Sequence, residues 1–351
     1  MRGMSILKNR YLLPAVLLGL VILSSMMVGE SKASSIGGSG IGKASKLGNQ
    51  DIEIPICLNR GEIPESENHW LYIPTYPYEL ETYDYLGFLS GQLIQAGKVD
   101  ASKCPQGGLW DNGYANPCGM EASNDAVIYM QNVYDDEILA QVDTVGVPPV
   151  MIKQLIRYES QFWPGYMGQY HFGLGHVTNI GAYTALQWNP DLYDDICIST
   201  YSHPCEYSFY QAPFEVKDLL SGRLLAVMNA SCPECEYAAD IPKAEKSIDY
   251  LAKVLMGYCR QTSQIVENST SVNPNLIMSY ATIWKLTLYS YNMGPTCLYN
   301  ALQSSYNTIK NQTDKKMDWA LISSFLTSSD CLQGKLYVDK ITHPYYDFPY
   351  P

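Results

Sequence analysis

A single glutamate, Glu159, follows an apolar helical stripe and is the residue best placed for acid–base chemistry. Pro148 and Pro149 open this stretch, and proline suits the first helical turn because its missing N–H has no intrahelical partner there. Helical spacing puts Ile156 and Glu159 on one face. There, partial burial and the negative end of the helix dipole disfavour an ionised carboxyl group, so Glu159 could hold and donate a proton. A helix phase shifted by one residue would instead make Glu159 a solvated surface acid.

Three short motifs occur in a fixed order at and after Glu159. They are YESQFWP at 158–164, FGLGH at 172–176 and YSYNMGP at 289–295. In this order they resemble the signatures of the soluble lytic transglycosylase family: a Glu-Ser pair on a helix, a Gly-Leu-Met-Gln turn and an Ala-Tyr-Asn-Ala-Gly segment. The stretch KSIDYL at 246–251 is similar to the helix between the second and third signatures. The resemblance extends over residues 146–310.

This resemblance implies a lysozyme-like helical domain that cleaves peptidoglycan with one carboxylate and with no metal or cofactor. Glu159 would protonate the glycosidic oxygen between N-acetylmuramic acid and N-acetylglucosamine. It would then take a proton from the C6 hydroxyl group, which closes a 1,6-anhydro ring. The resemblance also implies contacts with the glycan, and an orienting contact of Tyr291 with Glu159 or the substrate. The residues concerned are Ser160, Gly173, Leu174, His176, Tyr291 and Asn292.

The second motif departs from the family pattern. Gly175 stands where the family has methionine, and His176 stands where it has glutamine. A histidine still donates and accepts hydrogen bonds, and it also titrates near neutral pH. The interval from Glu159 to Tyr291 is longer than usual, and the additional length includes Cys197, Cys205, Cys232 and Cys235. These departures bear on glycan specificity and on activity itself.

Two other functions are compatible with the same residues. A hydrolase similar to goose-type lysozyme would need a second carboxylate about 6.5–9.5 Å from Glu159 to activate water. The candidates nearest in sequence are Asp191, Asp194 and Asp195. A catalytically inactive glycan-binding or structural module of the cell envelope would need none of them.

The overall charge of the chain excludes one class of partner. Its 351 residues carry a net charge of −12, and nucleic-acid binding needs a basic surface. Cell-wall polymers are themselves generally anionic, so a membrane tether would help by making steering by charge unnecessary. The expected partner is the glycan strand of peptidoglycan.

The first fifty residues predict export. Arg2, Lys8 and Arg10 precede an apolar run over 11–28, which is typical of an export signal with its positive end in the cytoplasm. Residues 1–28 are thus either a signal peptide or a signal anchor that tethers the protein to the membrane. For the first alternative, the sequence SKA at 31–33 offers a cleavage site. Residues 29–50 are rich in Gly and Ser and read as a flexible linker.

Ten cysteines, all beyond the export signal, predict disulfides formed in an oxidising compartment. Cys104 and Cys118 are expected to close a loop. The pair Cys232 and Cys235 could form a redox centre or half of a zinc site. A structural disulfide is favoured because no βαβ pattern surrounds the pair and no second CxxC exists.

The expected fold is mainly α. An irregular, disulfide-braced, Tyr- and Pro-rich extension over 51–145 should precede the lysozyme-like domain over 146–330, and 331–351 should form a C-terminal tail. Little helical pattern is found over 191–212, and Ser123 is expected to cap a helix over 123–142. Other helices are expected over 84–96, 180–189, 214–229, 244–262, 275–291, 296–310 and 317–326.

Overall fold

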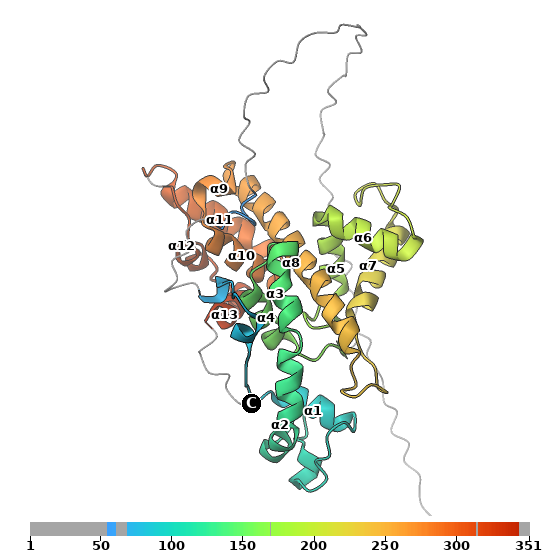
Figure 1. The fold of residues 1–351 in the computed structure, drawn as a ribbon. Helices are drawn as coiled ribbons and strands as arrows, with labels where there is room; N and C mark the ends of the chain where they lie inside the picture. The colour runs from blue at the N-terminus through green and yellow to red at the C-terminus, as the bar shows by residue number, and fades with distance from the viewer. Residues whose placement is uncertain (1–54, 61–68, 169, 314, 344–351) are drawn as a thin grey trace, which may run out of the picture. The chain divides into compact units, whose positions relative to one another are not determined.

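The computed structural model describes residues 55–60, 69–168, 170–313 and 315–343. The predicted export segment and linker lie outside these residues. The stretch Glu53–Pro351 forms one compact unit. Its described part is mainly helical, as predicted, and its one sheet is a two-stranded antiparallel hairpin (Figure 1). Within the described ranges, no helix combines the length and apolar character needed to cross a membrane.

The elements follow one another along the chain with short connections. The 3-10 helices are η1 (His69–Leu71), η2 (Pro77–Leu80) and η3 (Pro105–Gly108), and the strands are β1 (Tyr166–Met167) and β2 (His171–Phe172). The α-helices are α1 (Gly87–Gln95), α2 (Pro117–Asn132), α3 (Asp135–Thr144), α4 (Pro149–Glu159), α5 (Asn179–Trp188), α6 (Pro190–Tyr201), α7 (Phe214–Met228), α8 (Ile241–Thr270), α9 (Pro274–Ile277), α10 (Tyr280–Met293), α11 (Thr296–Ile309), α12 (Trp319–Ser324) and α13 (Ser329–Thr342).

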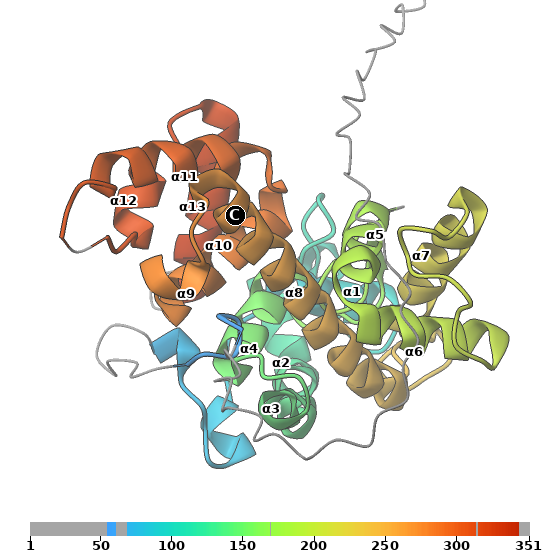
Figure 2. The same ribbon diagram turned by 90° about the horizontal axis from the view of Figure 1, so that it is seen from above.

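The long helix α8 is the axis of the core. Figures 1 and 2 show it running through the middle of the molecule, and it packs against α3, α5, α7, α10 and α11. The Asp240 side chain caps its start by accepting a hydrogen bond from the backbone N–H of Lys243, and Ser271 ends it in the left-handed conformation. Its apolar stripe, which includes Leu251 and Leu255, is completely buried. The helix is longer at both ends than the predicted range of 244–262.

Helix α4 confirms the stripe that the sequence predicts. Pro149 occupies its first turn, and Ile152 and Ile156 are fully buried. The helix ends at Glu159 because the backbone turns into the left-handed region at Gln161 and Phe162, with φ of 48° and 65°. The last helical residue is thus the candidate acid, and Phe162 is anchored in the core beyond it.

Two predictions are wrong, one for residues 123–142 of the extension and one for residues 191–212. The helix expected over 123–142 is divided between α2 and α3, and Asn116 rather than Ser123 caps its start. The Ser123 hydroxyl group donates to the carbonyl oxygen of Gly119 inside α2. Residues 191–212 also contain a regular helix, α6, which Asn189 caps and whose buried face includes Ile196.

The expected C-terminal tail over 331–351 is also wrong in its first part. Residues 329–342 form helix α13, which Ser328 caps and which packs against α4 and α10. Tyr337, Val338 and Ile341 are buried at helical spacing. The remainder of the predicted tail, from residue 344, lies outside the described residues.

Disulfides connect distant parts of the fold, and the described residues contain no free cysteine. The predicted pair Cys104–Cys118 is confirmed, and Cys232 and Cys235, predicted to form structural disulfides, pair with each other. The other pairs are Cys57–Cys259, Cys197–Cys205 and Cys297–Cys331. The first of these joins the extension to α8, and the last joins the start of α11 to α13. Disulfides in this number are typical of proteins that fold in an oxidising compartment.

Candidate active site

The carboxyl group of Glu159 lies at the C-terminal end of α4 with only 16% of its side chain exposed. Its Oε1 atom accepts a hydrogen bond of 2.6 Å from the hydroxyl group of Tyr337. Its Oε2 atom lies 3.7 Å from Nδ1 of His176, within reach of an ion pair when the imidazole is protonated. One carboxyl oxygen is therefore held in place, and the other is available for proton transfer.

Tyr337 is the hydrogen-bond partner of Glu159 that the sequence did not predict. It comes from α13, and Cys331 on that helix forms a disulfide with Cys297. Burial, and then the neighbouring Glu159, raise the pKa of Tyr337 well above its ordinary value. The phenol therefore stays protonated and donates to Glu159 at every physiological pH. The helical spacing of Tyr337, Val338 and Ile341 is the sequence signal that could have found it.

Tyr291, which the resemblance expects to orient Glu159 or the substrate, lines the same cavity as Glu159. Its hydroxyl group donates to the carbonyl oxygen of Gly175, at 2.6 Å. Burial, and then the charge of Glu159, raise the pKa of Tyr291 well above its ordinary value. Tyr258 of α8 supports the phenol ring edge-on, with ring centroids 5.2 Å apart. Tyr291 therefore fixes the turn beside Glu159.

This contact explains why position 175 is a glycine. A Cβ atom on Gly175 would lie 2.4 Å from Leu251 Cδ1 and 2.9 Å from the Tyr291 hydroxyl oxygen. A side chain here would displace the phenol or the core leucine.

His176 faces the same site in a constrained conformation. Its φ is +51°, and its side chain is buried. Its Nε2 atom is also buried and has no hydrogen-bond partner among the described residues. The imidazole packs edge-on against His171 of β2, with ring centroids 5.7 Å apart. Nδ1 is the imidazole nitrogen beside Glu159, whereas the unpartnered Nε2 is a buried polar group that a water molecule could satisfy.

The remaining predicted contact residues divide into two groups. The hydroxyl group of Ser160 donates to the Ile156 carbonyl oxygen, so it stabilises the end of α4. Gly173 (φ +69°) packs against the backbone of α7, and Leu174 is buried in the core, so both build the turn that carries His176. Of these residues, only Asn292 lines the cavity at Glu159.

The cavity has a volume of about 90 Å³ and is lined by residues of α4, β2, α5, α8 and α10 and of the turn between β2 and α5. Pockets that enclose a whole small molecule measure about 300–1,000 Å³. A substrate would therefore place only one or two of its groups here and lie mostly outside. The lining is Glu159, His171, His176, Val177, Thr178, Gly181, Tyr258, Tyr291 and Asn292.

The cavity lining contains no carboxylate besides Glu159. Two of the three aspartates considered for a hydrolase are paired elsewhere. Asp191 lies 3.4 Å from an Arg260 nitrogen, and Asp195 lies 2.7 Å from Lys253 Nζ. None of the three aspartates, including Asp194, belongs to the lining. The cavity lining thus provides one carboxylate, Glu159, with the imidazoles of His171 and His176 beside it.

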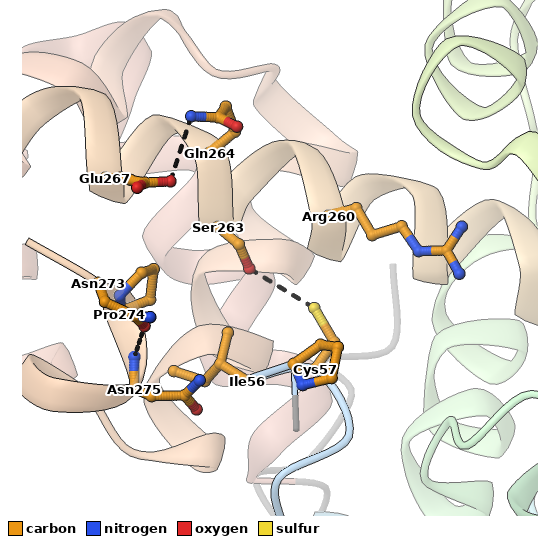
Figure 3. A pocket seen from close by; sticks show the side chains of 10 residues that line it. Ile56, Cys57, Arg260, Ser263, Gln264, Glu267, Asn273, Pro274 and Asn275 are labelled. Carbon is orange, nitrogen blue, oxygen red and sulfur yellow. Dashed lines mark hydrogen bonds between the residues drawn. The ribbon is translucent and has the colours of Figure 1, made fainter. Parts of the chain in front are cut away.

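A second pocket, of about 260 Å³, lies beside the Cys57–Cys259 disulfide (Figure 3). Its polar groups already engage each other: the Ser263 hydroxyl contacts Cys57 Sγ, and the Gln264 amide donates to Glu267. None of the predicted site residues lines it. It therefore offers no competing arrangement for acid–base chemistry.

No protein-family model, curated protein or solved structure matches this chain. The site must therefore be interpreted from its own geometry. That geometry is a half-buried carboxyl group at a helix end, with a phenol on one oxygen and an imidazole beside the other.

Proposed function

We propose that this protein is a peptidoglycan lytic transglycosylase that cleaves the β-1,4 bond between N-acetylmuramic acid and N-acetylglucosamine. The observation that carries the proposal is the Glu159 carboxyl group, held by Tyr337 beside a cavity with no second carboxylate. One carboxylate is what a lyase of this kind requires, whereas most hydrolases of glycosidic bonds use two. The ordered motifs around Glu159 and Tyr291 support the same reaction.

The reaction needs two proton transfers at one carboxyl group. Glu159 gives its proton to the glycosidic oxygen as the bond from that oxygen to C1 of N-acetylmuramic acid breaks. The acetamido group of the same sugar stabilises the positive charge at C1. The Glu159 carboxylate then takes the proton of the C6 hydroxyl group, whose oxygen bonds to C1 and closes the 1,6-anhydro ring. Glu159 ends the cycle protonated, and no water is consumed.

The residues around Glu159 have separate roles in this proposal. Tyr337 holds Oε1 and stabilises the carboxylate between the two transfers. His176 lines the cavity with Nδ1 3.7 Å from Glu159 Oε2, at the position where the resemblance implies a glutamine. Tyr291 keeps the turn that carries His176 against Glu159. Asn292 is available for contact with the glycan at the cavity edge.

Export to the cell envelope is part of the proposal. The substrate lies outside the cytoplasm, and five disulfides suit an oxidising compartment. The apolar run over 11–28 would deliver the protein there, as a cleaved signal or as a tether. A tether would keep a chain of net charge −12 close to an anionic polymer.

Product analysis tests this function. The full chain and its Glu159→Gln variant are incubated with purified peptidoglycan, and the soluble fragments are identified by mass spectrometry. We expect 1,6-anhydromuropeptides from the native chain and at least a hundredfold less from Glu159→Gln. Glu215→Gln, an exposed glutamate of α7 outside the cavity, is the control and should match the native chain.

Each other outcome would support a different function for this protein. Fragments with reducing ends would identify a hydrolase. Binding without release of fragments would identify a glycan-binding module. Full activity in Glu159→Gln would remove this residue from the chemistry.

A further inference from the structure

A third pocket, larger than the cavity at Glu159, lies between α1, the start of the β1–β2 hairpin and the Cys232–Cys235 loop. Its volume is about 480 Å³, within the range of about 300–1,000 Å³ that encloses small ligands. Its walls include the rings of Phe88, Trp163 and Tyr166, together with the side chains of Gln92 and Ser231. No residue of the chemistry described above lines it.

The aromatic walls of this pocket are held in place by the fold. The Phe88 ring lies against Tyr114, with centroids 5.6 Å apart, and the backbone N–H of Phe88 donates to Gln161 Oε1. Trp163 is only 7% exposed. A Cβ atom on Gly165 would lie 2.6 Å from its indole nitrogen, so only glycine allows this packing. The pocket is therefore formed before any ligand arrives.

The chemistry of the lining selects an uncharged, ring-shaped ligand with polar substituents. The residues around the pocket include no Asp, Glu, Lys, Arg or His. The Tyr166 ring, which is 58% exposed beside the nearly buried rings of Phe88 and Trp163, suits the apolar face of a sugar ring. The Gln92 amide can bond to hydroxyl and acetamido groups, and the Ser231 hydroxyl oxygen, whose proton goes to Asn229 Oδ1, can accept from them. A peptide with carboxylates and ammonium groups would find no charged partner here. N-acetylated sugars fit this combination.

The hairpin connects this pocket to the cavity at Glu159. Met167 of β1 lines the pocket, and its cross-strand partner His171 of β2 lines the cavity. Trp163 and Tyr166 also follow Glu159 on the same short segment. A glycan chain that crosses the hairpin could thus occupy both places.

We propose that the pocket bounded by Phe88, Trp163 and Tyr166 binds N-acetylated sugar rings of the glycan chain that is cleaved at Glu159. This inference rests on the proposed function for the identity of the chain. Helix α1, which belongs to the extension over 51–145, would then contribute directly to substrate binding. The extension thereby acquires a role beyond bracing the fold.

Binding to the full-length Glu159→Gln variant tests the pocket without cleavage. N-acetylglucosamine tetrasaccharide is titrated into this variant by calorimetry, alone and combined with Tyr166→Ala or Gln92→Ala. Tyr166 is 58% exposed, so its truncation should leave the fold intact. The matched control is Tyr207→Ala, because Tyr207 is 56% exposed and lies outside the pocket. Thermal unfolding of each variant checks that the fold is retained.

We expect Tyr166→Ala to weaken binding about tenfold and Gln92→Ala about fivefold, with no change for Tyr207→Ala. Native affinity in both pocket variants, or no binding of the tetrasaccharide at all, would overturn the assignment. Cleavage of peptidoglycan by the native chain is measured separately. Sugar binding that depends on Tyr166 without cleavage would refute the proposed function and leave the pocket standing. Cleavage by the native chain, together with unaltered sugar binding in Tyr166→Ala, would support the proposed function and refute the assignment of the pocket.

Discussion

The hydrogen bond from Tyr337 to Glu159 gives the sharpest quantitative prediction. Tyr337→Phe removes one oxygen atom and keeps the ring that packs in the core and edge-on against Tyr158, with centroids 5.2 Å apart. While Glu159 is protonated, the lost bond is one between neutral groups and is worth about 0.5–1.5 kcal/mol. When Glu159 has given up its proton, the same bond is to a charged group and is worth about 1.5–3 kcal/mol.

The difference between these two values determines the effect on the rate. About 1–2 kcal/mol of stabilisation appears only as the carboxylate forms, which corresponds to about a 5- to 30-fold lower kcat in Tyr337→Phe. Tyr337 does not line the cavity, so KM should change less than twofold. The assay is the initial rate of release of anhydromuropeptides from peptidoglycan at several substrate concentrations.

Tyr289→Phe is the control for loss of a buried hydroxyl group. Tyr289 is fully buried and donates 3.1 Å to the carbonyl oxygen of Cys331, on the same helix as Tyr337. Both variants should lose about 0.5–1.5 kcal/mol of unfolding free energy, but only Tyr337→Phe should lose rate. Equal kcat in Tyr337→Phe and the native chain would refute the role of this bond. Equal loss in both variants would show that the effect is structural.

Three further changes test the framework around the site. Burial raises the pKa of Asp135 from 3.8 to about 6, so the folded protein binds this proton more tightly than the unfolded chain. The unfolding free energy contributed by Asp135 should therefore fall as pH rises from about 4 to about 6, and urea titrations should show no such fall in Asp135→Asn. Replacing Cys57 and Cys259 by alanine opens a loop with a sequence separation of 202 and should cost up to about 5 kcal/mol in denaturant unfolding; an unchanged midpoint would refute this. Gly175→Ala should cost about 1–3 kcal/mol and reduce activity, because the new methyl group overlaps a core leucine and the phenol of the site. Gly222→Ala, which meets nothing within 4 Å inside α7, should instead stabilise the protein by about 0.5–1 kcal/mol; the reverse order of these two variants in thermal unfolding would contradict the packing described.

Local sequence signals predicted the part of the site that a single helix builds. The spacing of Ile152, Ile156 and Glu159 placed the carboxyl group at a partly buried helix end, as the structure shows. Pro149 marks the start of this helix and the residues after Glu159 mark its end, so both boundaries could be predicted. The same kind of signal found α7 and α11 within a residue of their observed ends.

The contacts between distant helices could not be read in this way. Tyr337 reaches Glu159 across 178 positions of sequence, and only the packing of α13 against α4 brings them together. Tyr291 was expected to orient Glu159 or the substrate, and nothing in the sequence indicated that its hydroxyl group would donate to the carbonyl oxygen of Gly175, where the absence of a side chain leaves room for the phenol. Helix α6 was not predicted because its polar and aromatic residues obscure the helical spacing of the narrow buried face around Ile196.

The origin of Tyr337 in the last described helix has a consequence for biosynthesis. A nascent chain that has not yet extended past this position contains Glu159, His176 and Tyr291 but lacks the phenol that holds the acid. If α13 docks after α4 and α10 have packed, the Glu159 carboxyl group acquires its phenol partner only in that late step of folding. Unfolding of α13 alone would take the phenol away from Glu159 and leave most of the core in place.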